Sequence, residues 1–143
     1  MNISIIGAGN GGQAMAGHFS LLGHNIKLYN RTISKIKEIV KRKEINLNDK
    51  ITGTATISCV TDDLKTAISG TAVIMVTTTA DAHKTIAIDI APYIEDNQII
   101  VLNPGRTLGA LEFSLELKKR TTKRFFIAEA QSLIYACRAD KPG

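Results

Sequence analysis

Residues 3–12 read I-S-I-I-G-A-G-N-G-G, and this stretch predicts the fold of the chain. A short apolar run typical of a buried strand stops at Gly7, and glycines then follow the spacing G-x-G-x-x-G at Gly7, Gly9 and Gly12. In a strand–turn–helix unit that holds a dinucleotide, the first glycine permits the turn, the second lets a pyrophosphate approach the backbone, and the third lets the helix pack on the strand. The unpaired N–H groups at the start of that helix attract phosphate.

A purely structural glycine turn is the alternative interpretation of this motif. The motif follows an apolar strand and opens a run compatible with a helix, which is the context that the dinucleotide interpretation requires. We therefore predict a nucleotide site. Its phosphate-binding turn comprises Gly7, Ala8, Gly9, Asn10, Gly11 and Gly12.

The composition is that of one globular domain that binds a small anion. The 143 residues are 44% hydrophobic, and no apolar run approaches the length of a membrane span. The net charge of +5 comes with only 5% aromatic residues, so we expect an anionic small ligand and no nucleic acid. Met1 leads directly into the first predicted strand, so we expect no targeting segment and a cytoplasmic location. Cys59 and Cys137 show no metal-ligand spacing, and we predict free thiols and no metal site.

Apolar segments of strand length alternate along the chain with segments of helical periodicity. This alternation predicts an α/β fold, a doubly wound parallel sheet of the Rossmann type formed by residues 1–143 as one domain. A small β excursion is expected between residues 44 and 56, and a further short strand at 132–137. The predicted strands lie at residues 3–6, 25–29, 56–60, 72–76, 99–102 and 125–128, and the predicted helices at 10–22, 33–42, 62–68, 81–91 and from 108 onward.

The end of the second predicted strand indicates which dinucleotide is bound. NAD-binding domains carry an acidic residue about 20 positions after the glycines, where it binds the ribose hydroxyls. Asn30 occupies that place here, followed by Arg31 and Thr32, so no carboxylate repels a 2′-phosphate and a guanidinium is present to clamp it. We predict that Asn30, Arg31 and Thr32 bind NADP, with NAD as the alternative. Lys35, Lys37, Lys41, Arg42 and Lys43 add positive charge nearby, and for the later lysines a solvated helix face is the better interpretation.

Three threonines follow the fourth predicted strand, and ligands of doubly wound sheets lie beyond the carboxyl ends of the strands. We therefore predict that Thr77, Thr78 and Thr79 line the ribose and diphosphate of the cofactor. His83 continues an apolar helical stripe, which favours a packing role over a place in the cleft, and His18 receives the same interpretation. We predict no catalytic residue in this chain.

The fifth predicted strand ends in a turn that contains a proline, a glycine and a candidate helix cap. Thr107 is placed to cap the next helix, in which Leu108, Leu111 and Leu115 recur at helical spacing. The run N-P-G-R-T-L-G-A-L-E-F at 103–113 resembles the octopine/nopaline (opine) dehydrogenases. The runs A-E-A-Q-S-L-I-Y-A-C-R at 128–138 and T-T-T-A-D-A-H at 77–83 fit the same family, so the resemblance extends over essentially the whole chain.

The resemblance implies a reaction and the place of several residues. Members of that family use NADH or NADPH to reduce the imine formed between a 2-oxo acid, such as pyruvate, and an amino acid. By analogy with the family, Asn103, Pro104 and Gly105 lie beside the nicotinamide of the cofactor, and Arg106 approaches the carboxylate of the oxo acid.

The chain departs from that family in one large respect. Opine dehydrogenases have a second, mostly helical domain that holds the amino-acid site and a His–Asp proton relay, and no segment of this sequence corresponds to it. The chain by itself is therefore expected to bind cofactor without turnover. It is also expected to expose an apolar patch near residues 103–107 or 132–137, which would allow a homodimer.

Two further classes of protein share the same opening motif. A ketopantoate reductase or a 6-phosphogluconate dehydrogenase-like enzyme would fit the N-R-T triplet at 30–32, although the later runs match those enzymes less well. A regulatory nucleotide-binding module, similar to the domains that gate potassium channels, would fit the chain length. Such modules usually keep an acid where Asn30 stands, which argues against them.

Overall fold

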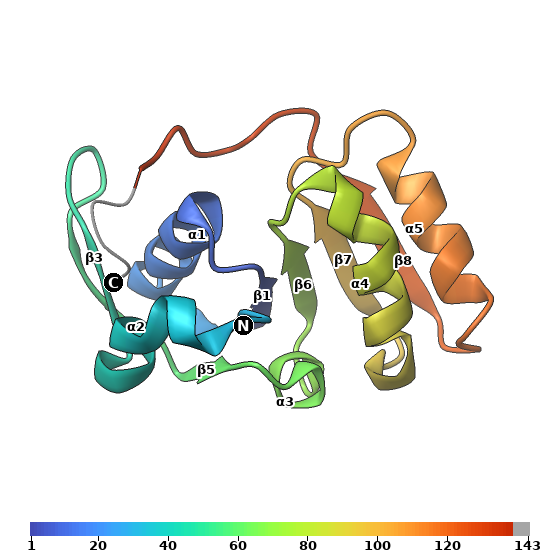
Figure 1. Ribbon diagram of the computed structural model, residues 1–143, viewed down its shortest axis with the longest axis horizontal. Coiled ribbons are helices and arrows are strands. Elements are labelled where there is room, and N and C mark those ends of the chain that lie inside the picture. Colours follow the sequence, from blue (N-terminus) through green and yellow to red (C-terminus); the bar gives the residue numbers. More distant parts are fainter. Residues whose placement is uncertain (139–143) are drawn as a thin grey trace.

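The computed structural model describes residues 1–138 and contains a six-stranded sheet in which all neighbouring strands are parallel (Figure 1). The strand order is β5-β2-β1-β6-β7-β8, so the chain builds outward from β1 on one side and then on the other. This order confirms the predicted doubly wound α/β fold. The strands of the sheet are β1 (Asn2–Ile6), β2 (Asn25–Tyr29), β5 (Cys59–Thr61), β6 (Val73–Val76), β7 (Gln98–Leu102) and β8 (Phe125–Glu129).

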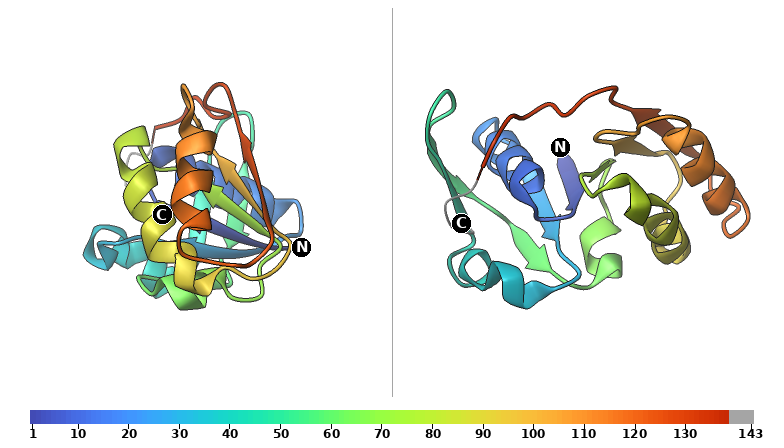
Figure 2. Two further views of the ribbon diagram at one scale, coloured as in Figure 1. Left: turned by 90° about the vertical axis from the view of Figure 1, so that its right-hand side faces the viewer. Right: turned by 45° about the horizontal axis from the view of Figure 1, so that its top comes forward.

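Helices cover both faces of the sheet, as the apolar clusters on its two sides show. One cluster joins α1 and α2 to the β1–β2 half, and the other joins α3, α4 and α5 to the opposite face. Figures 1 and 2 show α4 and α5 lying side by side on that second face. The α-helices are α1 (Asn10–Leu21), α2 (Lys37–Arg42), α3 (Leu64–Ile68), α4 (His83–Ile90) and α5 (Gly109–Lys118), and the 3-10 turns are η1 (Ile33–Ile36), η2 (Ala80–Ala82) and η3 (Ala91–Tyr93).

The carboxyl ends of the three central strands lie level with one another. Ile6 at the end of β1 pairs with Tyr29 at the end of β2 and with Val76 at the end of β6. The turns that follow these strands therefore meet at the carboxyl end of the sheet. Doubly wound folds bind their ligands at this end.

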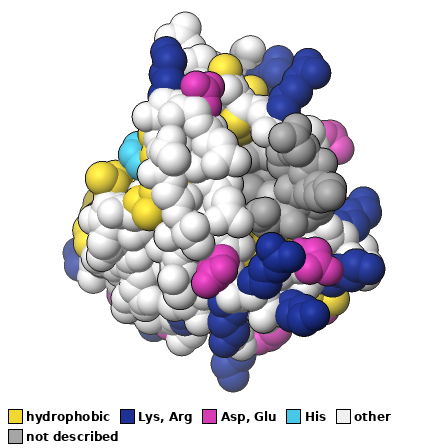
Figure 3. All heavy atoms as spheres, turned by 90° about the vertical axis from the view of Figure 1, so that its left-hand side faces the viewer, with side chains coloured by type: hydrophobic (Ala, Val, Ile, Leu, Met, Phe, Trp, Pro, Cys, Tyr) yellow, Lys and Arg dark blue, Asp and Glu magenta, His cyan; other side chains and the backbone are white. Residues whose placement is uncertain are grey.

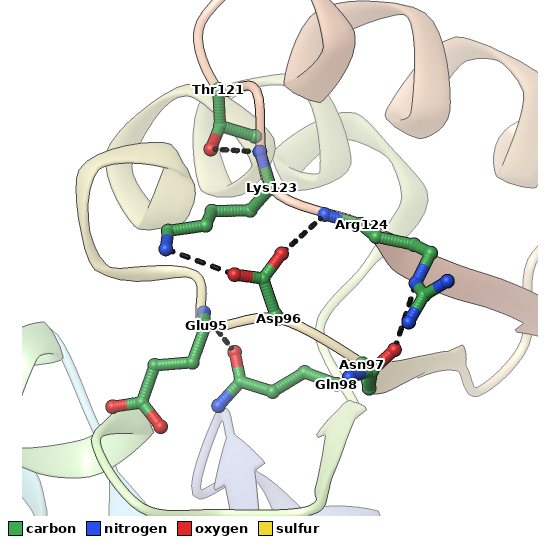
Figure 4. Close-up of polar contacts among 7 residues, drawn as sticks. All are labelled: Glu95, Asp96, Asn97, Gln98, Thr121, Lys123 and Arg124. Carbon is green, nitrogen blue, oxygen red and sulfur yellow. Dashed lines mark hydrogen bonds and ion pairs between the residues drawn. The ribbon is translucent and has the colours of Figure 1, made fainter.

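The opposite edge, at the amino ends of β7 and β8, is closed by a polar network (Figure 4). The Asp96 carboxylate accepts hydrogen bonds from the Arg124 backbone N–H (2.9 Å) and from Lys123 Nζ (3.0 Å), and these bonds hold the pKa of Asp96 below its usual value. Arg124 Nε donates to Asn97 Oδ1 (2.9 Å). The buried Gln98 donates from Nε2 to the carbonyl of Thr71 (2.9 Å), which ties β7 to the turn before β6. These hydrogen bonds join the turns before β6, β7 and β8 at the end of the sheet that lies away from the candidate site.

Several predicted elements differ in extent or are absent. The predicted β excursion is an antiparallel hairpin of β3 (Glu44–Leu47) and β4 (Gly53–Thr56), and the third sheet strand begins at Cys59, later than predicted. The prediction of a strand at 132–137 is wrong, because this segment has no regular secondary structure. It leaves the edge strand β8 and passes toward α1 (Figure 1), where Tyr135 packs on the apolar cluster, so it pairs with no strand.

Large apolar side chains are exposed in the turn after β7, on α5 and in the segment after β8, among other places. Leu108 is 66% exposed, and Leu111 and Leu115 are also exposed, so the predicted leucine stripe of α5 faces outward; Phe113 and Leu117 form its core face instead. Leu133 and Ile134 are 63% and 57% exposed. An apolar patch therefore lies where the sequence predicted one. Within residues 1–138, no helix is both long and apolar enough to cross a membrane.

Basic side chains around α2 are solvated. Lys37, Lys41 and Lys43 are exposed, and Arg42 lies 3.8 Å from Glu38 on the surface of the same helix. Figure 3 shows the corresponding side of the molecule, where Lys and Arg side chains are interspersed with acidic ones and do not form one continuous patch. This surface agrees with the interpretation of the later lysines as a solvated helix face.

Candidate functional site

The three glycines of the motif have three different environments. Gly7 has a φ of +107°, a conformation that L side chains rarely adopt. A Cβ on Gly12 would overlap the carbonyl oxygen of Gly7, so α1 can approach β1 only because Gly12 has no side chain. A Cβ on Gly9 would meet nothing within 4 Å. The turn is thus folded by Gly7 and Gly12, while Gly9 faces open space.

The amino end of α1 borders this open space. Gly9 is the N-cap of α1, and no side chain of the turn caps the helix. The first intrahelical bond runs from the Gln13 N–H to the Gly9 carbonyl (2.9 Å), so the N–H groups of Asn10, Gly11 and Gly12 have no helical acceptor. These groups and the partial positive charge of the helix end suit a phosphate.

The three threonines after β6 divide into two roles. Thr77 Oγ1 donates to the carbonyl of Gly7 (2.8 Å), so Thr77 fixes the glycine turn against β6. Thr78 and Thr79 line the neighbouring pocket. Thr78 Oγ1 is buried and has no hydrogen-bond partner among the described residues, which is unusual for a hydroxyl.

Asn30 connects the glycine turn to the loop after β2. Its Oδ1 accepts a hydrogen bond from the Ala8 N–H (3.2 Å), and its Nδ2 donates to the carbonyl of Thr32 (2.8 Å). Both ends of the amide are therefore engaged by the protein backbone. Arg31 and Thr32, which follow it, are exposed and line the pocket.

A pocket of about 440 Å³ lies at the carboxyl ends of β1, β2 and β6. Its size is within the range of small-molecule sites. Apolar side chains from α3 and α4 form its walls, and cationic side chains come from the loop after β2 and from η1. The lining residues are Ile6, Gly7, Tyr29, Asn30, Arg31, Thr32, Lys35, Leu64, Thr78, Thr79, Asp81, Ala82, Thr85, Ile86 and Asp89.

Sequence reasoning missed the wall formed by α3 and α4. Leu64 and Ile86 are half-buried and contribute apolar surface, and Tyr29 lies at the end of β2. Burial raises the pKa of Tyr29, and the negative charge of Asp89 raises it further. No motif marks these residues, because a pocket wall needs only apolar side chains at the right place in three dimensions.

A second hollow, of about 780 Å³, lies at the carboxyl ends of β7 and β8. Asn103 is 2% exposed, its Nδ2 donates to the carbonyl of Val101 (3.0 Å), and its Oδ1 has no partner among the described residues. Gly105 packs so closely on Glu129 that a Cβ would overlap that side chain. The hollow is lined by Pro104, Arg106, Thr107, Leu108, Glu129, Ala130, Gln131, Ser132 and Leu133.

Glu129 performs the capping role that the sequence predicted for Thr107. The residue before α5 is Leu108, which has a left-handed backbone and makes no side-chain cap. Glu129 Oε2 instead accepts a hydrogen bond from the Ala110 N–H in the first turn of α5 (2.8 Å). The prediction for Thr107 is therefore wrong: a carboxylate from β8 satisfies the helix end, and the local sequence carries no sign of it.

The histidines have packing environments. His83 is 1% exposed, its ring meets Phe113 edge-on, and burial lowers its pKa. His18 Nδ1 lies 2.8 Å from the hydroxyl of Tyr135, which packs on the apolar cluster beside α1. Both thiols, Cys59 and Cys137, are free, as predicted. Among residues 1–138, no cluster of three or more His, Cys, Asp or Glu side chains is placed to hold a metal.

Sequence comparison relates the chain to NAD-binding domains. Residues 2–108 match the NAD binding domain of 6-phosphogluconate dehydrogenase. Over 141 residues, or 98% of this chain, the sequence is 36% identical to an opine dehydrogenase of Arthrobacter sp. (strain 1C). The chain spans only 39% of the length of that relative.

Comparison with solved structures gives the same result for the fold. Octopine dehydrogenase with NADH and pyruvate matches with a TM-score of 0.86 at 20% identity, over 99% of this chain and 38% of that one. Yersinopine dehydrogenase with bound NADP⁺ matches with a TM-score of 0.70 at 16% identity, over 89% of this chain and 34% of that one. The resemblance to opine dehydrogenases is thus confirmed, and the chain belongs to the family of the NAD binding domain of 6-phosphogluconate dehydrogenase.

Proposed function

We propose that this chain is the NADP(H)-binding part of an opine dehydrogenase-like oxidoreductase, which condenses a 2-oxo acid with an amino acid reductively. The observation that carries the proposal is the pocket beside the glycine turn, which has cationic side chains and no acid at the end of β2. The substrates are small molecules, and neither nucleic acid nor membrane is part of the proposal. A cytoplasmic location belongs to the same proposal.

The diphosphate of the cofactor would lie against the glycine turn. The unpaired N–H groups at the start of α1 and the open space at Gly9 suit two phosphate groups. Thr78, whose hydroxyl is buried without a partner among the described residues, would donate to a ribose or phosphate oxygen. Thr77 would act indirectly, because its hydroxyl holds the Gly7 carbonyl.

The 2′-phosphate would lie at the loop after β2. Arg31 offers a bidentate guanidinium, and Thr32 and Lys35 line the same pocket. The structure changes the role proposed for Asn30: its amide is engaged with Ala8 and Thr32, so it shapes the loop and keeps a neutral group where other domains carry a carboxylate.

The nicotinamide would lie toward the turn that begins at Asn103. Pro104 lines the second hollow, and its chain neighbours are the buried Asn103 and Gly105, which packs on Glu129 of β8. When bound, the cofactor supplies the hydride. This chain contributes binding and orientation, which bring a donor and an acceptor into reacting geometry. Arg106 lines the same hollow and would meet the carboxylate of the oxo acid.

The match to the 6-phosphogluconate dehydrogenase domain keeps that class as the alternative. Its model covers residues 2–108, whereas the likeness to the Arthrobacter opine dehydrogenase extends over 141 residues and includes the segment after β8. The longer likeness is the reason for preferring the opine class.

The test is a calorimetric titration of NADPH and of NADH into the wild-type chain and into Arg31→Ala. A charge-assisted hydrogen bond to Arg31 is worth about 1.5–3 kcal/mol, which corresponds to roughly ten- to a hundred-fold tighter binding of NADPH. Arg31→Ala should remove most of this preference. Lys37→Ala is the matched control, because Lys37 is exposed on α2 and does not line the pocket. Equal affinities of the wild-type chain for the two cofactors would contradict the NADP assignment.

Turnover is a second test of the same proposal. The chain of 143 residues, supplied with NADPH, pyruvate and an amino acid, should show cofactor binding without steady NADPH oxidation. Hydride transfer to an imine needs the acceptor held close and a group that manages its proton, and none of the described histidines is placed to do this. Steady oxidation above the rate without protein would overturn this part of the proposal. Light scattering would show whether the patch of Leu108, Leu133 and Ile134 produces the proposed homodimer.

A further inference from the structure

The pocket beside β2 has one wall formed by a single helical stripe. This wall consists of four residues from η2 and α4, whose spacing in the sequence places them on one helical face: Ala82, Thr85, Ile86 and Asp89. The helix starts at the carboxyl edge of the sheet and runs back along it. Asp89 therefore lies about 9 Å farther from that edge than the start of α4, at 1.5 Å per residue.

The charges of the pocket are separated by element. Arg31 comes from the loop after β2 and Lys35 from η1. The two acids of the pocket, Asp81 and Asp89, come from η2 and from the last turn of α4. The apolar side chains of Leu64 and Ile86 line the same pocket. The pKa of Tyr29 responds to charges of both signs. Burial raises this pKa most, the negative charge of Asp89 raises it further, and the positive charge of Arg31 lowers it.

This pattern matches the chemistry of a phosphorylated adenosine. The ribose-phosphate end is anionic and suits Arg31 and Lys35, and the purine has apolar faces that suit Leu64 and Ile86. Adenine carries an exocyclic amine, a hydrogen-bond donor, at the edge farthest from the ribose. A 6-oxopurine carries a carbonyl oxygen at that position, which a carboxylate repels.

We propose that Asp89 is a specificity-determining residue that selects an adenine base over a 6-oxopurine by accepting a hydrogen bond from the exocyclic amine. The inference rests on the proposed function, because it places the cofactor's adenosine in this pocket. Nothing in the glycine motif or in the loop after β2 distinguishes the two bases, so the discrimination falls to the α4 wall.

The experiment compares NADPH with nicotinamide hypoxanthine dinucleotide phosphate by calorimetric titration. The wild-type chain should bind the hypoxanthine analogue roughly ten-fold more weakly, the factor expected when one charge-assisted hydrogen bond is lost. Asp89→Asn should bring the two affinities within about two-fold, because an amide both accepts from an amine and donates to a carbonyl. Asp89 is exposed, so its replacement should leave the melting temperature unchanged.

Asp62→Asn is the matched control. Asp62 also raises the pKa of Tyr29 and is exposed, but it does not line the pocket. The control removes the same charge and should keep the ten-fold preference for adenine. Equal binding of the two dinucleotides by the wild-type chain, or equal loss of preference in both variants, would overturn the role of Asp89 and leave the proposed function standing. No binding of either dinucleotide would overturn both.

Discussion

Adding one methyl group to Gly12 should lower the stability of the protein, whereas adding one to Gly9 should leave stability unchanged and weaken cofactor binding. In Gly12→Ala the new Cβ would overlap the carbonyl oxygen of Gly7 and lie 2.7 Å from Thr77 Oγ1, so α1 must move away from β1. Overpacking of this kind costs about 3 kcal/mol at its usual upper end, and the helix propensity of alanine returns about 1 kcal/mol. The net loss of about 2 kcal/mol should lower Tm by roughly 6 °C for a chain of this size.

Gly9→Ala meets no such obstacle in the protein. Gly9 has φ −70° and ψ −177°, which alanine adopts readily, and nothing lies within 4 Å of the new Cβ. The lower entropy of the unfolded chain stabilises by about 0.4–1 kcal/mol, and alanine is a poorer N-cap than glycine by a similar amount. Tm should therefore stay within about 2 °C of the wild type. The methyl group occupies the approach to the α1 N–H groups, so the affinity for NADPH should fall at least about ten-fold.

Thermal melts followed by circular dichroism and NADPH titrations on the wild type and both variants measure the two effects separately. The expected pattern is a low Tm for Gly12→Ala, and a normal Tm with weak cofactor binding for Gly9→Ala. The reasoning would be refuted if Gly9→Ala bound NADPH as tightly as the wild type. It would also be refuted if Gly9→Ala melted as low as Gly12→Ala, because open space at Gly9 would then be the wrong description of the turn.

Three other changes test separate parts of the structure. Asn30→Asp should reverse the cofactor preference toward NADH in paired titrations, because a carboxylate repels the 2′-phosphate and accepts from ribose hydroxyls; an unchanged preference for NADPH would contradict this. Glu129→Ala should cost about 1 kcal/mol in urea unfolding, as for other lost helix caps, while Glu129→Gln, which keeps an acceptor for the Ala110 N–H, should lose less. Hydrogen bonds from Thr66 lower the pKa of Asp63 in the folded protein. Asp63 should therefore stabilise the protein above the ordinary carboxyl pKa of about 4, and this stabilisation should disappear as the pH falls through the lower pKa of the folded state. The difference in urea midpoint between wild type and Asp63→Asn should accordingly shrink from pH 7 to pH 3.

Sequence alone predicted those features that depend on local patterns. The apolar run before Gly7, the glycine spacing and the alternation of strands with helices predicted the doubly wound sheet, because each acts within a few residues of the chain. The identity of the residues at the end of β2 likewise follows from counting along the motif. The role of Asn30 toward a cofactor stays a prediction, and its side-chain partners, Ala8 and Thr32, became visible only in three dimensions.

The remaining features depend on residues that are distant in sequence. Glu129 accepts a hydrogen bond from Ala110, which lies 19 residues before it in the first turn of α5, so no local rule could have preferred it to Thr107. The α4 wall of the pocket has the same origin: Asp89 lines one pocket with Tyr29 and Arg31, which are about 60 positions away in the sequence. The segment at 132–137 has the composition of a strand, but it leaves the sheet edge and so has no partner.

The position of β1 in the strand order bears on how the protein assembles. β1 is connected to its neighbour β2 by residues 7–24, which include α1, whereas its other neighbour, β6, begins only at Val73. The hydrogen bond from Thr77 to Gly7 joins the same two parts of the chain, because these residues are 70 positions apart. Closing a contact of that length is slow compared with forming the β1–α1–β2 unit. We therefore expect the glycine turn to take its final form only after β6 has paired with β1, and cofactor binding during refolding should report this step.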